Sequence, residues 1–307
     1  MKKILICLLI LYTTISQAKK RNDVAFIKPI VIATYQYADN NRLVNIQPLA
    51  SLLEKETGYK VTAKSYPTIF EFISAIKNGE VDIALINTFG YMLLQESGNN
   101  MLTSVALEVR ADAKDNYKTA IVVPSTSKIS SFDDIKQDTE NFNLKLVTEG
   151  STSGNLVPRL LFTKLSIGDA EKHFKSVSYG KTHKLTIEAV ANGLADLAAM
   201  GSAEYFSFIA NNENKDKVRL LQLSPEIPLG PVLLNKMLPL HFRNKINLVL
   251  LGLHDKNPNE LEFVKAGWTE ARQAEKYVKI NPSYYDAFKK ALGKKKDLLK
   301  IIKQFAN

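Results

Sequence analysis

The residues of this 307-residue chain that are best suited to chemistry stand between two glycines, Gly150 and Gly154, where Ser151, Thr152 and Ser153 supply three consecutive hydroxyls. An apolar stretch typical of a buried strand precedes them, and apolar residues at helical spacing follow. A turn from a strand into a helix places hydroxyls and unpaired backbone N–H groups at the positive end of the helix dipole. These donors match the oxygens of a phosphate, phosphonate or sulfonate group, and glycines let the backbone approach it. The pattern therefore predicts an oxyanion site, with an ordinary polar cap loop as the alternative.

The helix that follows this turn contains a proline, Pro158. Proline has no backbone N–H and is tolerated without cost only in the first turn of a helix. We therefore expect Gly154 or Asn155, rather than Ser151, to be the N-cap residue.

The same turn has the Gly-x-x-x-Gly spacing of a nucleophile elbow, and His183 lies downstream as a possible general base. The central residue is Thr152 instead of serine, however, and no Asp or Glu is evidently placed to orient His183. We therefore predict no catalytic residues and keep a hydrolase only as a weaker alternative. His183 begins an expected helix, where it either donates to a bound anion or lies at the surface.

Metal binding is not indicated by the remaining histidines. His173, His241 and His254 show no metal-ligand spacing with one another or with carboxylates. We predict neither a metal site nor a cofactor.

The first residues have the form of an export signal. Two lysines precede an apolar run at residues 4–12, and small residues at Ser16 and Ala18 fit a signal-peptidase site. We expect cleavage after Ala18 and a periplasmic mature protein that begins at Lys19. Cys7, the only cysteine, lies in the removed segment, which excludes disulfides and cysteine nucleophiles from the mature chain.

Composition is that of an ordinary globular protein with a basic excess. The formal net charge is +10, of which the leader contributes two lysines. This charge gives a weak preference for anions. The basic residues are not interleaved with aromatic residues, so binding to nucleic acid or to a membrane surface is the less favoured alternative.

One ten-residue pattern occurs twice, at residues 75–84 and again at 189–198. In each copy an apolar helix ends at an Asn-Gly pair, whose glycine can adopt the left-handed cap, and an aspartate three residues later opens a buried strand. The repetition predicts two α/β lobes of similar build. A ligand is normally bound between two such lobes.

Local patterns predict the elements of the first lobe. Residues 30–34, 60–65 and 81–86 resemble strands, and the helices between them begin at Asn45 and at the capping box that opens with Thr68. With Asn45 as N-cap, the proline at position 48 falls in the first turn.

Lobe boundaries follow from this pattern. We expect lobe one at residues 19–119 and 225–307, and lobe two at 120–224, joined by short crossovers. The last part of the chain is predicted to be helical and to add to lobe one or wrap the hinge. It ends in an amphipathic helix docked on a lobe, with Leu298, Ile301 and Ile302 on the apolar side.

Taken together, these motifs resemble the phosphonate-binding periplasmic proteins, which are the substrate receptors of phosphate, phosphite and phosphonate ABC importers. The residues that carry the resemblance occur in the family's order along roughly residues 28–250: Tyr35, the segment 81–84, Phe89-Gly90-Tyr91, the Ser-Thr-Ser-Gly-x-Leu-x-Pro signature at 151–158, His183, the second Asn-Gly corner and Ile227-Pro228.

The resemblance implies a two-lobed α/β type II periplasmic binding fold that closes on its ligand. It implies that Ser151, Thr152, Ser153 and His183 hold the phosphonate oxygens. It also implies that Tyr91 and an aromatic residue of the first loop, Tyr35 or Tyr37, border them from lobe one. The expected partners are a small anionic ligand and an ABC permease in the inner membrane, with the protein itself a monomer.

Two positions depart from family members that bind 2-aminoethylphosphonate, which carry acidic residues for its ammonium group. Gly230 stands beside the Ile-Pro segment where one acid is expected, and Glu204 is the candidate for the other. The resemblance therefore favours phosphite, a simple alkylphosphonate, phosphate or another small oxyanion. A protein of the same fold that serves a sensory receptor is the alternative function.

Overall fold

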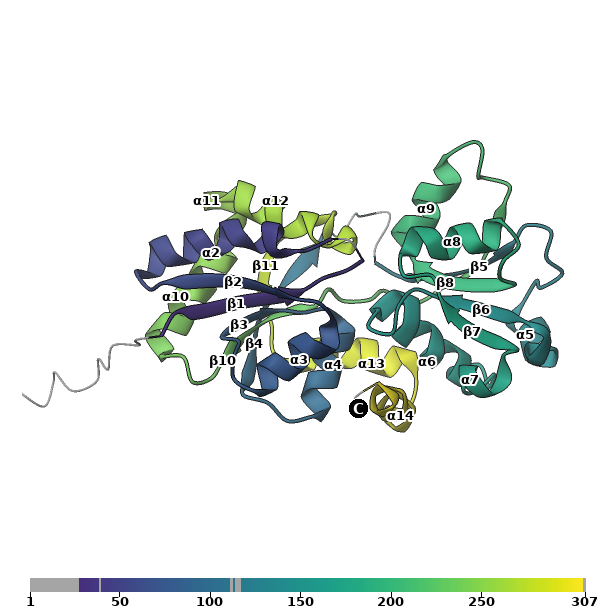
Figure 1. The fold of residues 1–307 in the computed structure, drawn as a ribbon, viewed down its shortest axis with the longest axis horizontal. Helices are drawn as coiled ribbons and strands as arrows, with labels where there is room; N and C mark the ends of the chain where they lie inside the picture. The colour runs from purple at the N-terminus through teal and green to yellow at the C-terminus, as the bar shows by residue number, and fades with distance from the viewer. Residues whose placement is uncertain (1–27, 39, 111–112, 114–116, 306–307) are drawn as a thin grey trace, which may run out of the picture.

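The computed structural model describes residues 28–305 except 39, 111–112 and 114–116. Two β-sheets form the centres of two lobes, which lie end to end along the long axis of the molecule (Figure 1). The expected cleavage site lies outside the described residues. Within the described ranges, no helix has the length and apolar character needed to span a bilayer.

The first lobe contains a six-stranded sheet in the order β11-β4-β10-β3-β1-β2. Its strands are β1 (Ile30–Tyr35), β2 (Val61–Tyr66), β3 (Ile83–Leu85), β4 (Met101–Val109), β10 (Pro231–Asn235) and β11 (Ala274–Lys279). The first three are parallel, whereas β10 returns from the second lobe and pairs antiparallel with both β3 and β4.

The second lobe contains a five-stranded sheet in the order β7-β6-β8-β5-β9. Its strands are β5 (Thr119–Pro124), β6 (Asn143–Leu146), β7 (Ser176–Tyr179), β8 (Leu197–Gly201) and β9 (Val218–Leu223). In the order of this sheet the parallel strands β7, β6 and β8 lie beside the antiparallel strand β5, as β2, β1 and β3 lie beside β10 in the first lobe.

The repeated Asn-Gly corners have the same structure in both lobes. Gly79 and Gly193 have φ angles of 75° and 72°, the left-handed conformation that glycine adopts without steric strain. After each corner an aspartate accepts from the backbone N–H of the lobe's first parallel strand: Asp82 from Val31 at 3.0 Å, and Asp196 from Asn143 at 2.7 Å. The repeat in the sequence thus encodes one helix-to-strand connection used twice.

Helices cover both faces of each sheet. On the first lobe, α2 (Leu43–Thr57), α10 (Leu240–Leu251), α11 (Leu253–Lys256) and α12 (Pro258–Ala266) cover one face, and α3 (Ile69–Lys77) and α4 (Thr88–Glu96) the other. The second lobe carries α5 (Phe132–Gln137), α6 (Val157–Lys164), α7 (Ala170–His173), α8 (His183–Ala191) and α9 (Ser202–Ala210).

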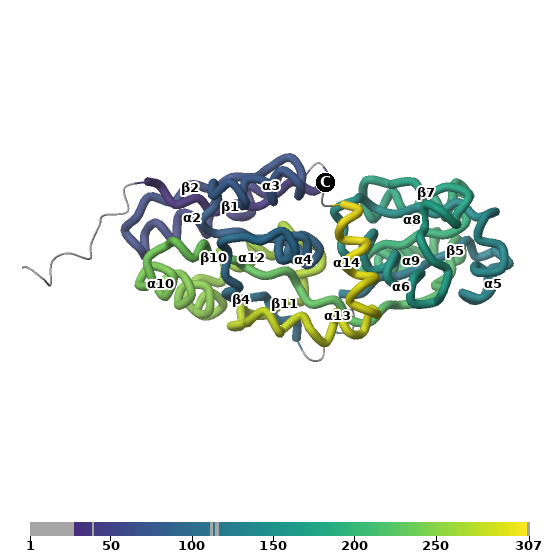
Figure 2. The backbone as a smooth tube through the Cα atoms, turned by 90° about the horizontal axis from the view of Figure 1, so that it is seen from below, coloured from purple at the N-terminus to yellow at the C-terminus, as the bar shows by residue number. Residues whose placement is uncertain are grey.

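The C-terminal helices α13 (Asp286–Leu292) and α14 (Lys295–Gln304) lie at the junction of the lobes (Figures 1 and 2). We expected the last helix to dock on one lobe, but α14 contacts α4 of lobe one and α6 of lobe two. Its buried residues Leu298, Ile301 and Ile302 join an apolar cluster that runs through both lobes, including Phe89 and Leu160.

Three local predictions were wrong. Helix α2 begins at Leu43 with Arg42 at its N-cap, so Asn45 lies inside the helix and Pro48 is past the first turn. The part of the chain after residue 235 is not all helical, because β11 forms an edge of the first sheet. Neither Gly154 nor Asn155 is an N-cap: Ser151 caps a π-helical turn, Thr152–Leu156, and Leu156 is the N-cap of α6, although Pro158 does lie in the first turn of α6 as expected.

Candidate functional site

A cavity of about 440 Å³ lies between the lobes, at the carboxyl end of β1 in the first sheet and of β6 and β7 in the second. Lobe one lines it with the segment after β1 and with residues from the start of α3 and from the loop before α4. Lobe two lines it with residues 148–152 and with Tyr179, Lys181 and His183. Open α/β sheets bind ligands at this end of their strands.

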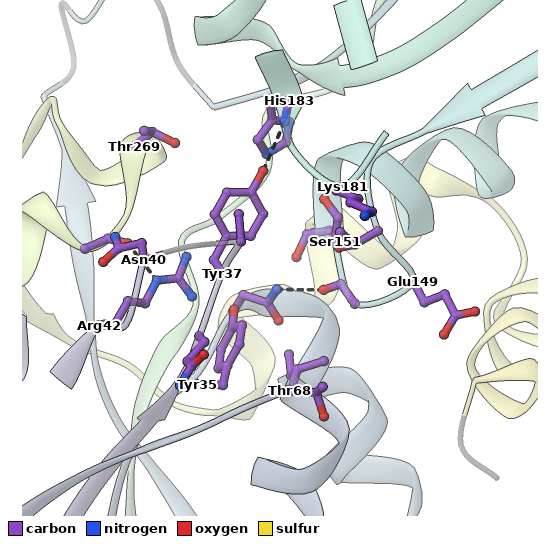
Figure 3. A pocket seen from close by; sticks show the side chains of 18 of the residues that line it. Tyr35, Tyr37, Asn40, Arg42, Thr68, Glu149, Ser151, Lys181, His183 and Thr269 are labelled. Carbon is purple, nitrogen blue, oxygen red and sulfur yellow. Dashed lines mark hydrogen bonds between the residues drawn. The ribbon is translucent and has the colours of Figure 1, made fainter. Parts of the chain in front are cut away.

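Ser151 and Thr152 bring hydroxyls to the cavity wall from lobe two, and Figure 3 shows Ser151 there. Ser151 Oγ accepts from the N–H of Gly154 at 3.0 Å, and Thr152 Oγ1 accepts from the N–H of Phe89 at 3.1 Å. Each hydroxyl is thus used as an acceptor and keeps its proton for donation. The backbone N–H groups at the first positions of the helical turn have no acceptor within it. This arrangement is suited to an oxyanion.

Ser153 and Gly154 lie behind this wall and do not line the cavity. Ser153 is fully buried, and its Oγ is 3.1 Å from the hydroxyl of Tyr117. A side chain at Gly154 would overlap Val147. Glycine is therefore required there for packing within lobe two, and the expectation that it lets the backbone approach a ligand is not met.

A buried arginine holds this turn from behind. Arg159 of α6 is 3% exposed and donates from Nε to Asn155 Oδ1 at 2.7 Å. Asn155 in turn donates to the carbonyl oxygen of Glu149 at 2.7 Å. Arg159 also forms an ion pair with Glu171. These contacts fix the turn, because each buried polar group has a partner.

His183 reaches the cavity as a neutral hydrogen-bond donor. Its Nδ1 accepts from the N–H of Gly201 at 3.0 Å, so the proton of the neutral ring is on Nε2. Burial, together with the charge of Arg42, lowers the pKa of His183 to about 4. The ring therefore remains uncharged at neutral pH and can donate one hydrogen bond to a ligand.

Two tyrosines and an arginine form the lobe-one wall (Figure 3). The guanidinium carbon of Arg42 lies 4.8 Å from the ring centroid of Tyr35 and 5.5 Å from that of Tyr37. Tyr37 also reaches the other lobe: its hydroxyl accepts from the N–H of His183 at 3.1 Å, and the two rings are 5.7 Å apart.

Other hydrogen bonds join the lobes at the cavity floor. Asn87 Nδ2 donates to the carbonyl oxygen of Gly150 at 2.9 Å, beside the bond between Phe89 and Thr152. Gly150 packs on Ile69, which a side chain at position 150 would overlap. The described conformation therefore has the two lobes in contact.

Two expected site residues are elsewhere. Tyr91 is buried beside Tyr285, with ring centroids 4.8 Å apart, and its hydroxyl accepts from Gln95. It does not line the cavity, because the helical turn of α4 directs it toward the C-terminal helices. Glu204 lines a neighbouring cavity that shares His183 and Glu270 with the first.

Gly230 is also outside the cavity that Ser151 and Thr152 line. It lines a small apolar cavity and packs against the backbone of Ile86 and Asn87, with which any side chain would overlap. An acidic residue could not be placed here without moving that backbone, so position 230 of this chain cannot supply an acid to the cavity between the lobes.

We expect Gly230→Ala to lower the free energy of unfolding by about 1–3 kcal/mol or more, because the added methyl group meets backbone atoms that cannot turn aside. Urea denaturation would measure the change. Gly201→Ala is the matched control, since its methyl group would meet no atom closer than 3.4 Å. Equal stability of the two variants would contradict the packing argument.

Several cavity residues were not predicted from the sequence, chiefly Arg42, Asn87, Tyr117 and Glu270. Arg42 and Asn87 come after the carboxyl ends of the parallel strands β1 and β3. Their place in the sequence after a predicted strand could therefore have identified them as candidate ligand-binding residues. Glu270 comes from a distant part of the chain, for which no local pattern exists. Among the described residues, no three His, Cys, Asp or Glu side chains are grouped so that they could hold a metal ion.

Comparisons with known proteins agree with this architecture. A family model described as ABC transporter, phosphonate, periplasmic substrate-binding protein matches residues 32–285. A probable ABC transporter phosphite binding protein, PhnD1 of Prochlorococcus marinus, is 23% identical over 207 residues, which are 66% of this chain and 68% of that protein.

Solved structures show the same fold. PhnD1 of Prochlorococcus marinus in complex with methylphosphonate has a TM-score of 0.66 at 18% identity, covering 86% of this chain and 97% of that chain. A binding protein component of an ABC phosphonate transporter from Pseudomonas aeruginosa has a TM-score of 0.66 at 19% identity, covering 91% and 94%. Because the family model spans most of its length, the chain belongs to the periplasmic substrate-binding proteins of phosphonate ABC transporters.

Proposed function

We propose that this protein captures a small phosphorus oxyanion, namely a phosphonate, phosphite or phosphate, between its lobes and delivers it to an ABC permease in the inner membrane. The observation that carries the proposal is the set of donors on lobe two, namely the hydroxyls of Ser151 and Thr152 and the Nε2–H of His183. These groups line one cavity, and each of them donates its hydrogen bond as an uncharged group.

Within this proposal Ser151, Thr152 and His183 contact the phosphonate oxygens, and Tyr35 and Tyr37 close the site from lobe one. Ser153 and Gly154 support the turn from behind. Tyr91 and Glu204 are not included, for the geometric reasons given above.

The protein is proposed to act without catalysis. In a hydrolase triad the histidine donates its Nδ1 proton to a carboxylate, which orients the ring as a base. Here Nδ1 of His183 accepts from a backbone N–H. The ring is therefore in the opposite tautomer, which suits hydrogen-bond donation to an anion.

We further propose that residues 19–119 with 225–307, and residues 120–224, are the two units that move as the cleft opens and closes. The division is supported by the membership of the two sheets, although α14 contacts both units. The protein is proposed to be a monomer, and closure on the ligand would signal occupancy to the permease.

A ligand panel tests the proposed function. Phosphate, phosphite, methylphosphonate, 2-aminoethylphosphonate, sulfate and taurine would be compared by thermal shift and then by calorimetry. A true ligand stabilises the folded state by about 2.7 kcal/mol at a hundredfold excess over its Kd. Stabilisation by sulfate or taurine and by none of the phosphorus anions would overturn the proposal.

We expect phosphite or methylphosphonate to bind more tightly than 2-aminoethylphosphonate. An ammonium group desolvated in a closed cleft needs a paired carboxylate, and without one its burial costs several kcal/mol. The donors of the proposed site supply no such partner. If calorimetry ranks 2-aminoethylphosphonate first, a cavity acid such as Glu270 must pair with the ammonium, which Glu270→Gln would then reveal.

The export signal gives a separate prediction. The mature protein is expected to begin at Lys19, because Ala18 completes the small-x-small pattern after the apolar run. Intact-mass measurement on protein recovered from the periplasm would identify the first residue. An uncleaved product would contradict the proposed processing.

A further inference from the structure

Arg42 is a buried cation on the wall of the cavity that the function proposed above does not use. Its side chain is 4% exposed and lines the cavity from lobe one. Nε donates to the carbonyl oxygen of Gly267 at 2.7 Å, which fixes the direction of the guanidinium group. The aromatic rings of Tyr35, Tyr37 and Trp268 surround it, with that of Trp268 4.6 Å away.

The guanidinium of Arg42 has a free donor and, within the described part of the chain, no carboxylate in direct contact. Nη1 is buried and has no hydrogen-bond partner. Arg42 takes part in none of the ion pairs found among the described residues. A buried arginine normally has a carboxylate partner, because its desolvation is costly. Three aromatic faces offset part of this cost, and an anionic ligand group would offset the rest.

The position of Arg42 separates it from the oxyanion donors of lobe two. Tyr37 contacts both Arg42 and His183: the guanidinium lies 5.5 Å from the centroid of the Tyr37 ring, and the imidazole centroid lies 5.7 Å from it. Figure 3 shows Arg42 and Ser151 on opposite sides of Tyr37. The cavity thus has a cationic end on lobe one and a neutral-donor end on lobe two.

We propose that Arg42 forms a second anion subsite and that the preferred ligand is a small phosphonate that carries a second acidic group, a carboxylate. The proposal rests on the proposed function, because it assumes that the phosphonate group occupies the donors of lobe two. The planar guanidinium recognises a carboxylate well, and pairing would use the donor that is free in the protein.

The other charged residues of the cavity do not take this role from Arg42. Glu149 is exposed, and in Figure 3 its carboxylate points away from the labelled cluster. Lys181 is exposed beside Ser151 on lobe two. Glu270 lines the cavity on the side of Arg42 but is not within ion-pair distance of it. An ammonium in place of the carboxylate would be repelled by Arg42.

The test compares phosphonoacetate with methylphosphonate by calorimetry at pH 7.5, on the wild type and on Arg42→Met. We expect the wild type to bind phosphonoacetate roughly tenfold or more tightly than methylphosphonate, since a hydrogen-bonded charge pair has about that effect. Arg42→Met should abolish this ratio, because it should weaken the binding of phosphonoacetate roughly tenfold more than that of methylphosphonate. Arg42→Lys should keep part of it, because it retains the charge but not the planar group.

The test uses the ratio of the two affinities, because a change in the stability of the protein would alter the binding of both ligands by the same factor. Arg243→Met is the matched control: Arg243 also donates from Nε to a carbonyl oxygen, that of Leu238 at 3.1 Å, but it does not line the cavity. This variant should keep the wild-type ratio. Equal wild-type affinity for both ligands would overturn the second subsite, as would an equal loss of affinity for both ligands in Arg42→Met. Binding of neither ligand would overturn the second subsite, and if phosphite and phosphate also failed to bind, the proposed function would be overturned with it.

Discussion

Thr152→Val is expected to weaken methylphosphonate binding by about tenfold to more than a hundredfold. Valine keeps the shape of threonine but removes the hydroxyl, and a hydrogen bond to a charged oxygen contributes roughly 1.5–3 kcal/mol. The hydroxyl also accepts from the N–H of Phe89 across the lobes. Its loss leaves that buried N–H unsatisfied, so the melting temperature should fall as well. Calorimetry and thermal unfolding of the ligand-free protein measure the two effects separately.

Thr139→Val provides the control for this variant. Thr139 is also a buried threonine, and its hydroxyl donates to the carbonyl oxygen of Ile135 at 2.7 Å, away from the cavity. It should lose stability without losing affinity. If Thr152→Val behaved in the same way, the Thr152 hydroxyl would only join the lobes, and the anion would be held elsewhere.

Acidification of the ligand-free protein is expected to cost up to about 3 kcal/mol of stability through His183 alone. Burial and Arg42 hold its folded-state pKa at about 4, below the unfolded value of 6.5. Above pH 6.5 both states are neutral and there is no cost. Between pH 6.5 and 4 only the unfolded state takes up the proton, so stability falls as the pH falls. Each pKa unit corresponds to about 1.4 kcal/mol, which sets the size of the effect.

Urea unfolding at several pH values between 7.5 and 4 would measure this loss, with His183→Gln as the comparison. The variant should lack the fall in this window, because glutamine does not titrate. Carboxylates with lowered pKa act at lower pH: hydrogen bonds from Ser130 lower the pKa of Asp134 to about 2. Parallel pH profiles for wild type and variant would show that His183 is not held neutral by the fold.

Much of the fold follows from local patterns. The two Asn-Gly corners depend on glycine at a left-handed position and on an aspartate that binds the neighbouring strand, and both requirements are visible in ten residues. The hydroxyls at 151–153 were likewise located from their place between a strand and a helix. Two of the three line the cavity, whereas Ser153 faces the interior of lobe two.

The sequence by itself determined the two-lobed α/β architecture and the turn that carries the donors, because these depend on interactions between residues close together in the chain. Only the tertiary structure decided which side chains share the cavity. Arg42 is held by the carbonyl oxygen of Gly267, 225 residues away, and Tyr91 is turned toward the C-terminal helices. Such contacts arise from the packing of elements that are far apart in the chain. The hydrophobic periodicity and the capping residues of a segment do not indicate which other segments it packs against.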